Sequence, residues 1–477
     1  MVEYEPVIGL EVHAQMKTQS KIFCGCPTEF GGTPNSHVCP VCLGMPGVLP
    51  VLNERVVEFA IRIGIALNCE IADYTKFDRK NYFYPDLPKD YQISQYDQPI
   101  CKNGYLVIQG KKIRIHRAHM EEDAGKLVHA GAAGLHGSDY SLVDYNRTGV
   151  PLLEIVSEPD LESADQAREY LTELRTILRY IDVCHGNLEE GTFRCDANVS
   201  VRPKGDTTLG TKAELKNMNS FRAIQRAIDF EIKRQSELLS RGERVVQESR
   251  LWDEASQSTY TMRSKEEAHD YRYFPEPDLV PLLIDRKWVD SVKEHMPELP
   301  VARRNRYINE HGISADEALV LTEDKAMSDF FDESIKLGAS GKAVSNWLIG
   351  PVNAFLKESA KEITDTHITP ENMRDLGNAV SSGKLNSNSA KTILAELLEK
   401  PGSVASVIES KGLVQVSDEK ELESVIVKVL EANPTQVAEF RSGKTKVRQF
   451  LFGAAMKELK GKGNPAVINK ILDEKLS

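Results

Sequence analysis

The sequence lacks any hydrophobic run long enough to cross a membrane. No apolar stretch approaches the roughly 18 residues that a membrane helix needs. The start, M-V-E-Y-E-P-V-I-G-L, has neither a basic segment nor a long apolar one. Low-complexity segments and sustained repeats are also missing, and the composition is that of an ordinary globular protein, 27% charged and 41% hydrophobic over 477 residues. We therefore expect a cytoplasmic protein of about three domains that makes no use of a membrane.

Several common catalytic motifs are missing as well. The G-K-T at 443–445 has Ala438 where the first glycine of a P-loop would stand. The sequence contains no H-E-x-x-H and no G-x-S-x-G. If the protein uses ATP, it does so without a P-loop.

Acidic residues outnumber basic ones overall, 71 to 60, but positive charge is concentrated near the C-terminus. The formal net charge is −11, which argues against general binding to polyanions. Residues 441–477, however, carry nine Lys and Arg against three acids. This basic tail is either a solvated helix face or a contact surface for nucleic acid, and both interpretations stay open on composition.

The pattern of apolar residues changes near residue 290. Before it, β-type runs are interspersed with helices predicted after Ser163 and after Ser220. This order favours an α+β fold over a strict βαβ alternation. Beyond the joint at 297–300 the pattern is helical, at 344–357, 371–382, 389–399, 419–431, 446–459 and 464–475. We predict domains at 1–291, 292–407 and 408–477.

Four of the eight cysteines are clustered in two short pairs, C-G-C-P and C-P-V-C, with twelve residues between the pairs. Two such knuckles can place four thiolates in a tetrahedron, as structural Zn²⁺ requires. A disulfide pair and an iron–sulfur cluster are the alternatives, although a reducing cytosol disfavours the first and the spacing disfavours the second. The predicted zinc ligands are Cys24, Cys26, Cys39 and Cys42.

Several acids stand in strand-like or apolar contexts. Glu11 and His13 are two apart, so a strand would point both to the same face. Such acids are costly to bury unless they are paired or bound to a cation, and a group of them would suit Mg²⁺ or Mn²⁺. Each acid taken alone is better explained by a surface position or a salt bridge. The acids in question are Glu11, Glu121, Glu122, Asp123, Glu154 and Asp196.

The segment 77–96, F-D-R-K-N-Y-F-Y-P-D-L-P-K-D-Y-Q-I-S-Q-Y, interleaves aromatic and basic side chains. This mixture suits stacking on a nucleic-acid base while cations meet phosphates. An aromatic-rich strand pair packed in a core would have the same composition.

Long ordered stretches of the chain closely resemble the B subunit family of aspartyl/glutamyl-tRNA amidotransferases. These stretches are V-I-G-L-E-V-H, F-D-R-K-N-Y-F-Y-P-D-L-P-K, Y-Q-I-S-Q-Y-D-Q-P-I, H-M-E-E-D-A-G-K, P-L-L-E-I-V-S-E-P-D, R-C-D-A-N-V-S, K-A-E-L-K-N-M-N-S-F and D-Y-R-Y-F-P-E-P-D. They cover residues 7–278, and the helical C-terminal region is also similar to that of the family.

The resemblance implies a reaction. The side-chain carboxylate of Glu-tRNA(Gln) or Asp-tRNA(Asn) is phosphorylated with ATP, and ammonia from a partner glutaminase subunit then displaces the phosphate. Phosphorylation supplies a leaving group that a carboxylate lacks, and charge neutralisation by divalent metal assists the transfer. The family's catalytic domain is similar to glutamine synthetase, an antiparallel-sheet cradle. An amidase subunit, a small third subunit and mischarged tRNA are the implied partners.

The resemblance also implies roles for particular residues. The metal positions of the kinase centre match Glu11, His13, Glu122, Glu154 and Asp196, with Glu121 a less secure candidate. Lys80 and Lys126 are expected phosphate contacts. The four cysteines match the zinc-binding members of the family. The tail residues expected to contact tRNA are Lys444, Lys446, Arg448, Lys457 and Lys460. A tRNA-binding zinc scaffold without catalysis is the alternative.

Overall fold

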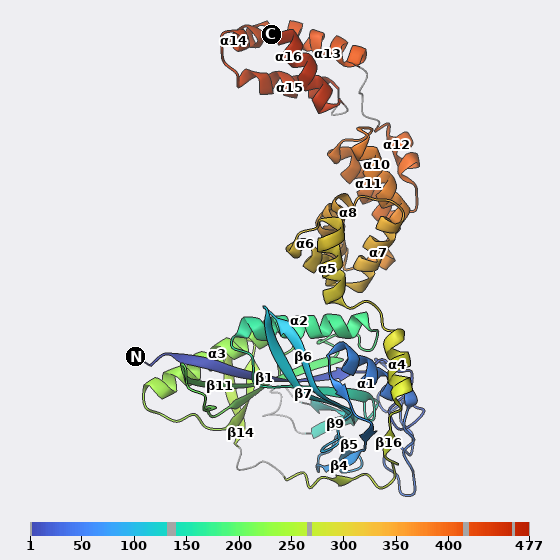
Figure 1. The fold of residues 1–477 in the computed structure, drawn as a ribbon, viewed down its shortest axis with the longest axis vertical. Helices are drawn as coiled ribbons and strands as arrows, with labels where there is room; N and C mark the ends of the chain where they lie inside the picture. The colour runs from blue at the N-terminus through green and yellow to red at the C-terminus, as the bar shows by residue number, and fades with distance from the viewer. Residues whose placement is uncertain (1, 131–139, 265–269, 414–418, 460–462, 477) are drawn as a thin grey trace. The chain divides into compact units, whose positions relative to one another are not determined.

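The computed structural model describes residues 2–130, 140–264, 270–413, 419–459 and 463–476, and the chain divides into two compact units at Leu299/Pro300. Helices and strands are mixed in the first unit, whereas the second is helical (Figure 1). The protein is therefore α+β with a helical C-terminal region, as predicted. The predicted boundaries at 291/292 and 407/408 fall inside helices α4 (Arg286–Glu294) and α12 (Val404–Lys411). No helix among the described residues is both long and apolar enough to traverse a bilayer.

The described part of the first unit is built on a nine-stranded sheet with the order β14-β13-β12-β11-β1-β10-β7-β6-β2. Neighbouring strands are antiparallel except β12 and β13, which run parallel because helix α3 (Phe221–Ser240) forms the crossover between them. The strands are β1 (Tyr4–Gln15), β2 (Glu70–Ile71), β6 (Cys101–Ile108), β7 (Lys111–Glu122), β10 (Pro151–Ser157), β11 (Phe193–Pro203), β12 (Ala213–Lys216), β13 (Glu248–Asp253) and β14 (Ser258–Ser264).

One face of the large sheet is apolar and covered by helices (Figure 1). Ile8, Leu10 and Val12 of β1 are buried there against α2 (Ala164–Tyr180) and α3 (Phe221–Ser240), and α1 (Glu54–Ala66) packs into the same core. The predicted cap residues are in place, since the Ser163 and Ser220 side chains accept hydrogen bonds from Gln166 N–H and Ala223 N–H. The opposite face of the sheet is left for polar side chains.

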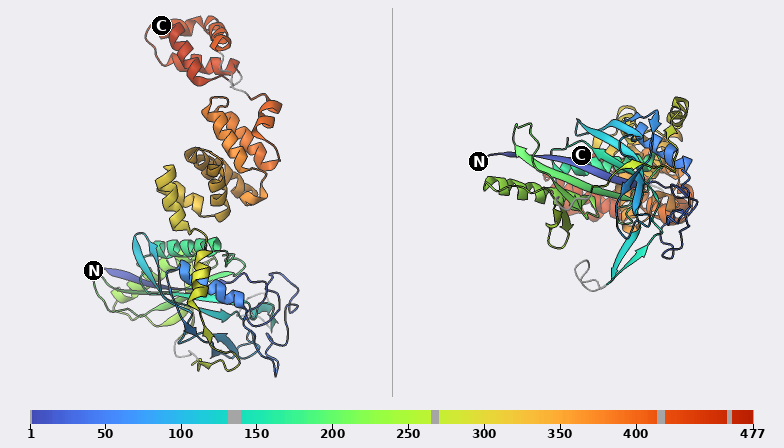
Figure 2. Two further views of the ribbon diagram at one scale, coloured as in Figure 1. Left: turned by 45° about the vertical axis from the view of Figure 1, so that its right-hand side comes forward. Right: turned by 90° about the horizontal axis from the view of Figure 1, so that it is seen from below.

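Shorter strands lie on the side of the large sheet opposite α2 (Figure 1). A small sheet of order β15-β4-β5 contains two parts of the aromatic segment 77–96, with β4 (Asp78–Asn81), β5 (Tyr91–Ser94) and β15 (Phe274–Pro275). The pair β8 (Lys126–Ala130) and β9 (Tyr140–Asp144) projects from the sheet (Figure 2, right). Strands β3 (Tyr74–Thr75) and β16 (Leu282–Leu283) form a further pair.

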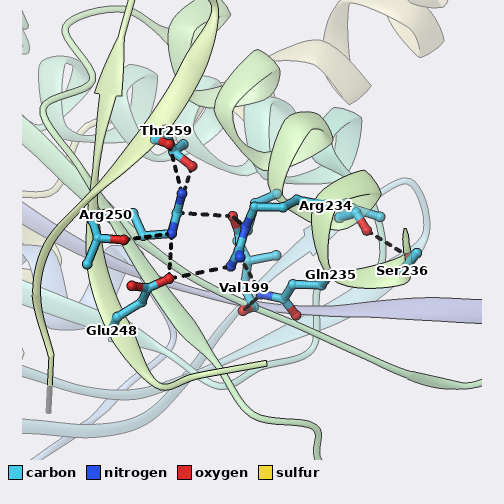
Figure 3. Close-up of polar contacts among 10 residues, drawn as sticks. Val199, Arg234, Gln235, Ser236, Glu248, Arg250 and Thr259 are labelled. Carbon is cyan, nitrogen blue, oxygen red and sulfur yellow. Dashed lines mark hydrogen bonds and ion pairs between the residues drawn. The ribbon is translucent and has the colours of Figure 1, made fainter. Parts of the chain in front are cut away.

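A buried group of charges fastens the β13–β14 hairpin to α3 (Figure 3). The fully buried Glu231 carboxylate accepts hydrogen bonds from Arg234 at 2.7 and 2.9 Å. Arg250 donates to Glu248 at 2.5 Å and to the Thr259 carbonyl at 2.8 Å. Because each buried charge has a partner, the desolvation cost is offset and the strand order at this edge is fixed.

The described helices of the second unit enclose two separate hydrophobic cores, one between Tyr307 and Ile408 and one between Leu422 and Leu476. The predicted helix 344–357 is interrupted by a π-helical turn at Leu348–Val352, because Pro351 cannot donate a backbone hydrogen bond. The other helices are α5 (Pro300–His311), α6 (Ala315–Thr322), α7 (Lys325–Lys336), α8 (Gly341–Trp347), α9 (Asn353–Ser359), a 3₁₀ turn (Ile363–Asp365), α10 (Pro370–Ser381), α11 (Ser387–Glu399), α13 (Glu419–Ala432), α14 (Pro434–Arg441), α15 (Val447–Glu458) and α16 (Pro465–Leu476).

Candidate functional site

The polar face of the large sheet places titratable side chains in adjacent rows. In the central row, His13 of β1 is opposite Glu154 of β10, which is opposite His119 of β7. In the next row, Glu11 is opposite Asp196 of β11. Because side chains two residues apart share a face, these rows lie next to each other on the sheet.

The central row closes into a compact group with Glu121. One ligand atom each from His13, Glu121 and Glu154 lies within 4.8 Å of the others. His13 Nε2 is 3.4 Å from Glu121 Oε1 and 3.5 Å from Glu154 Oε2. His119 Nε2 lies 3.3 Å from the same Glu154 oxygen, and its buried Nδ1 has no hydrogen-bond partner within the described residues. We call His13, Glu121 and Glu154 the acid–imidazole group.

The charges of this group act on one another. Burial works against the charged form of His13, but the hydrogen bond with Glu154 and the charge of Glu121 raise its pKa above the ordinary value. Burial likewise works to raise the pKa of Glu154, yet the two imidazoles His119 and His13 hold that pKa well below its usual range. A carboxylate kept ionised beside an imidazole in a half-buried site is a donor set that fits Mg²⁺ or Mn²⁺.

Glu11 and Asp196 lie in the adjoining row and have protein partners of their own. The Glu11 carboxylate accepts a hydrogen bond from Asn198 at 2.9 Å, and burial together with the charge of Glu154 raises its pKa. Asp196 is bound by Lys216 Nζ at 2.5 Å. Lys216 also reaches Glu214 at 2.9 Å, so that it neutralises two carboxylates at the border of the polar face.

Glu122 does not join the acid–imidazole group, contrary to the role implied by the resemblance, and Glu121 takes that place. Successive strand residues point to opposite sides, so the Glu122 side chain leaves β7 away from Glu121. Its carboxylate is bound by Lys89 Nζ at 2.5 Å and by the Ile93 N–H at 2.8 Å.

The two lysines predicted to contact phosphate lie in different places. Half-buried Lys80 of β4 is held near the acid–imidazole group. Burial works to lower its pKa, but the charges of Glu121 and Glu154 raise it. Lys126 is exposed and lines a cavity of about 550 Å³ together with Arg147, Arg194 and Asp196. This cavity therefore adjoins the polar face at Asp196.

The four clustered cysteines converge, with one sulfur of each within 4.8 Å of the others. A hydrogen bond from the Cys24 thiol, aided by the nearby Lys21 ammonium, lowers the pKa of Cys42 to about 4. Burial, together with a hydrogen bond involving Cys39, raises the pKa of Cys26 to about 11. Thiols this close to one another resist losing their protons together. A bound metal cation would remove that resistance, because thiolates are its ligands.

The predicted tail contacts are divided between paired and unpaired cations. Lys444 is 3.0 Å from Glu439, and Arg448 is 2.7 Å from Asp473. Among the described residues, Lys446 and Lys457 form no ion pair within 4.0 Å. Lys460 lies outside the described residues.

Sequence reasoning overlooked several residues at the site. His119 lies two positions before Glu121 in the quoted H-M-E-E-D-A-G-K, so strand alternation could have identified it. Lys216 is in the quoted K-A-E-L-K-N-M-N-S-F, where no local pattern indicates its partner Asp196. Tyr271 and Tyr273, in D-Y-R-Y-F-P-E-P-D, lie beside Lys80 because β15 pairs with β4, and that pairing is not encoded locally.

Comparison with known proteins covers the whole chain. Residues 6–290 match the family model described as the GatB/GatE catalytic domain, and residues 329–476 match the one described as the GatB domain. The B subunit of aspartyl/glutamyl-tRNA(Asn/Gln) amidotransferase from Carboxydothermus hydrogenoformans is 53% identical, with 100% of both chains covered. The protein of the same name from Brevibacillus brevis is also 53% identical with 100% of both chains covered. That from Trichodesmium erythraeum is 52% identical over 99% of this chain and 98% of its own.

Proposed function

Because this chain belongs to the B subunit family of aspartyl/glutamyl-tRNA(Asn/Gln) amidotransferases, we propose that the polar face of its large sheet is the centre at which a mischarged tRNA is activated with ATP. The chain is one component of a tRNA-dependent amidotransferase, a ligase complex with further subunits. The substrate at this face is the side-chain carboxylate of Glu-tRNA(Gln), of Asp-tRNA(Asn) or of both.

The chemistry requires an acyl phosphate. Ammonia cannot displace oxide from a carboxylate, so a carboxylate oxygen first attacks the γ-phosphorus of ATP, and ADP leaves. Ammonia then attacks the carbonyl carbon, and inorganic phosphate leaves with the former carboxylate oxygen. Phosphoryl transfer of this kind depends on positioning and on neutralising negative charge.

The observation that carries the proposal is the convergence of His13, Glu121 and Glu154 within 4.8 Å on one face of the sheet. These residues would hold a divalent cation, Mg²⁺ or Mn²⁺, which when bound neutralises charge on the transferred phosphoryl group. His119 would orient the Glu154 carboxylate, whose Oε2 lies 3.3 Å from His119 Nε2, as an outer partner of a ligand does. Glu11 and Asp196 complete an acidic border from the neighbouring row.

The cations around this border would orient the phosphates. Exposed Lys126 lines the cavity that adjoins Asp196 and would meet a phosphate there, whereas Arg147 and Arg194 of the same lining are bound to Asp123 at 3.5 and 2.9 Å. Lys80 lies near the acid–imidazole group, where its ammonium would meet the carboxylate that is to be phosphorylated. Lys216 holds Asp196 in place at 2.5 Å. We infer the same cradle architecture as glutamine synthetase, whose reaction also proceeds through phosphorylation of a glutamate carboxylate. A large sheet with one helix-covered face and one polar face supports that inference.

We assign the four-cysteine group to a structural Zn²⁺. Four thiolate donors leave no open coordination position, so this site organises the loop 24–42 and performs no catalysis. The loop contains few buried apolar side chains, and a metal would replace the missing core.

Further subunits complete the reaction in this proposal. An amidase subunit supplies ammonia from glutamine, a small third subunit completes a heterotrimer, and the helical tail binds tRNA through Lys444, Lys446, Arg448, Lys457 and Lys460. The cytoplasm is the expected compartment, because the product serves protein synthesis. No observation favours the alternative of a scaffold without catalysis.

The test is phosphoryl transfer in the complete complex. With [γ-³²P]ATP and mischarged tRNA, the wild type should form labelled phosphate that depends on both substrates and on Mg²⁺. Glu154→Gln should reduce this transfer at least about 100-fold, because it removes a charged ligand, while tRNA affinity changes little. The matched control is Glu158→Gln, a half-buried carboxylate just after β10 that pairs with exposed His116. Equal loss in both variants, or no transfer by the wild type, would reject the proposal.

A further inference from the structure

Tyrosine rings from three separate segments gather beside Lys80. Tyr82 lies 5.8 Å from Tyr84 and 6.0 Å from Tyr271 between ring centroids. Tyr273 lies 6.1 Å from Tyr271 and is stacked on Tyr96 at 4.2 Å, with 9° between the ring planes. Tyr82 and Tyr84 follow β4, Tyr96 follows β5, and Tyr271 and Tyr273 precede β15. We call these five residues the tyrosine cluster.

The cluster is held in place by the backbone around it. Asn81 donates hydrogen bonds to the Tyr271 carbonyl at 3.1 Å and to the Arg272 carbonyl at 2.7 Å, and its own backbone N–H donates to the Tyr271 carbonyl at 2.9 Å. Arg272 has a φ of 44°, which lies in the left-handed region. This conformation is unfavourable for a residue that has a side chain. Three hydrogen bonds from one side chain and its backbone therefore stabilise a strained turn between the two tyrosines.

Much of the aromatic surface in the cluster remains open to solvent. Tyr96 is 50% exposed and Tyr84 is 43% exposed. Tyr273 covers one face of the Tyr96 ring, as the parallel stacking requires. Adjacent Phe83 is 85% exposed. Leaving aromatic rings exposed is less favourable than burying them. Contiguous exposed aromatic side chains on a fixed backbone are therefore typical of a binding surface.

Lys80 connects the cluster to the acid–imidazole group. Its ammonium lies 5.0 Å from the centroid of the Tyr271 ring. The same ammonium experiences the charges of Glu121 and Glu154. A ligand stacked on the tyrosines would thus extend past Lys80 toward the carboxylates.

We propose that the tyrosine cluster is the stacking site for the adenine of the 3′-terminal nucleotide of the aminoacyl-tRNA. This inference rests on the proposed function and deepens it. In an aminoacyl-tRNA the amino acid is esterified to the ribose of that terminal adenosine, so the base and the reacting carboxylate belong to one compact unit. With the base on the tyrosines, the amino acid side chain points past Lys80 to the acid–imidazole group.

The structure favours this adenine over that of ATP. The cavity beside Asp196 has a volume of about 550 Å³, which is enough for a nucleotide, and exposed Lys126 in its lining can meet a phosphate. The tyrosine cluster instead presents stacking surface to solvent, where a single-stranded end arrives from outside. Adenine is common to all tRNA ends, so the cluster positions the acceptor end and does not choose among tRNAs.

The experiment is a binding cycle with the complete complex and uncharged tRNA. Wild type and Tyr96→Ala are each titrated with tRNA ending in CCA and with tRNA ending in CC. Removal of the terminal adenosine should weaken binding to the wild type by about tenfold, the scale of one stacked base. The same removal should weaken binding to Tyr96→Ala by less than about twofold, since the stacking partner is already gone. Equal losses in the two proteins would overturn the proposal.

Further variants separate the ring from other causes. Tyr96→Phe should keep the loss of affinity that follows removal of the terminal adenosine, because the ring is retained. If Tyr96→Phe shows no such loss of affinity, stacking is excluded as the reason. Tyr260→Ala, an exposed tyrosine of β14 outside the cluster, is the matched control and should behave as the wild type. A tenfold rise in KM for ATP with Tyr96→Ala, without a change in tRNA binding, would assign the cluster to ATP and overturn the proposal. Because the cycle needs no turnover, its outcome is independent of the phosphoryl-transfer test.

Discussion

At the scale of single residues, the neighbours Glu121 and Glu122 show where sequence reasoning fails. Ile113 and Ile115 are buried in the core, and uninterrupted alternation from them would turn Glu121 toward the core and Glu122 toward the polar face. The pairing of β7 with β10 shifts at Ser157, which is opposite Ile115 while Val156 is opposite Arg117. This irregularity inserts one residue and reverses the alternation. A bulge of this kind leaves no signal in one sequence.

The exchange of roles between these glutamates can be tested directly. Glu121→Gln should weaken Mn²⁺ binding to the complex at least about tenfold in the absence of ATP, because a charged ligand becomes neutral. Glu122→Gln should change that affinity by less than about threefold, since its carboxylate binds Lys89 and the Ile93 N–H. Titration monitored by the Mn²⁺ paramagnetic resonance signal measures both. The opposite ranking would return Glu122 to the metal site.

Other residue-level predictions depended on the resemblance more than on patterns. The spacing of Glu11 and His13 predicted that both side chains lie on one face of a strand, and the structure confirms this. Spacing could not bring Glu154 beside His13, because these residues lie far apart in the chain and meet through strand pairing. The nearness of the cysteine pairs in sequence, in contrast, was enough to predict their convergence.

At the scale of elements, local signals predicted many of the helices. Helices α2 and α3 begin after the expected serine caps. Long-range pairing was not predictable in the same way. The parallel β12–β13 pair and the β4–β15 pair join segments whose patterns do not identify their partners.

The knuckle formed by the four cysteines gives a prediction at this scale. Purified wild-type protein should retain about one Zn²⁺ per chain, and Cys39→Ser should lose most of it. Without the metal the loop 24–42 has little apolar core, so limited proteolysis should cleave it sooner in the variant. Metal analysis by mass spectrometry and a digestion time course measure the two effects. Cys69→Ser, a thiol outside the group, is the control. A metal-free wild type with four reactive thiols would contradict the assignment.

At the scale of the whole molecule, the uneven charge distribution predicts how tRNA affinity is built. The core between Leu422 and Leu476 is separate from the one that precedes it, so residues 419–477 can be removed as a unit. Lys446 and Lys457, which have no ion pair among the described residues, are the cations most available to phosphates.

Deletion of 419–477 should therefore weaken tRNA binding and flatten its dependence on salt. Each lost phosphate contact lowers the steepness of log affinity against log salt by about 0.7 to 0.9, so loss of the contacts of Lys446 and Lys457 alone predicts a change of at least about 1.5, and loss of all five proposed contacts a larger one. Filter binding at several salt concentrations gives the slope. Lys325→Ala, in α7 outside the deleted region, is a charge control. Unchanged affinity and slope would leave the tail as a solvated helical surface.

The central claim is that residues from β1, β7 and β10 jointly hold the cation that activates the carboxylate. Its most direct test is a crystal of the complex soaked in Mn²⁺, with diffraction recorded at the manganese absorption edge. The account predicts an anomalous peak about 2.2 Å from His13 Nε2 and from carboxylate oxygens of Glu121 and Glu154. A manganese peak at another site would contradict this claim. So would the absence of a peak at an Mn²⁺ concentration that supports full activity.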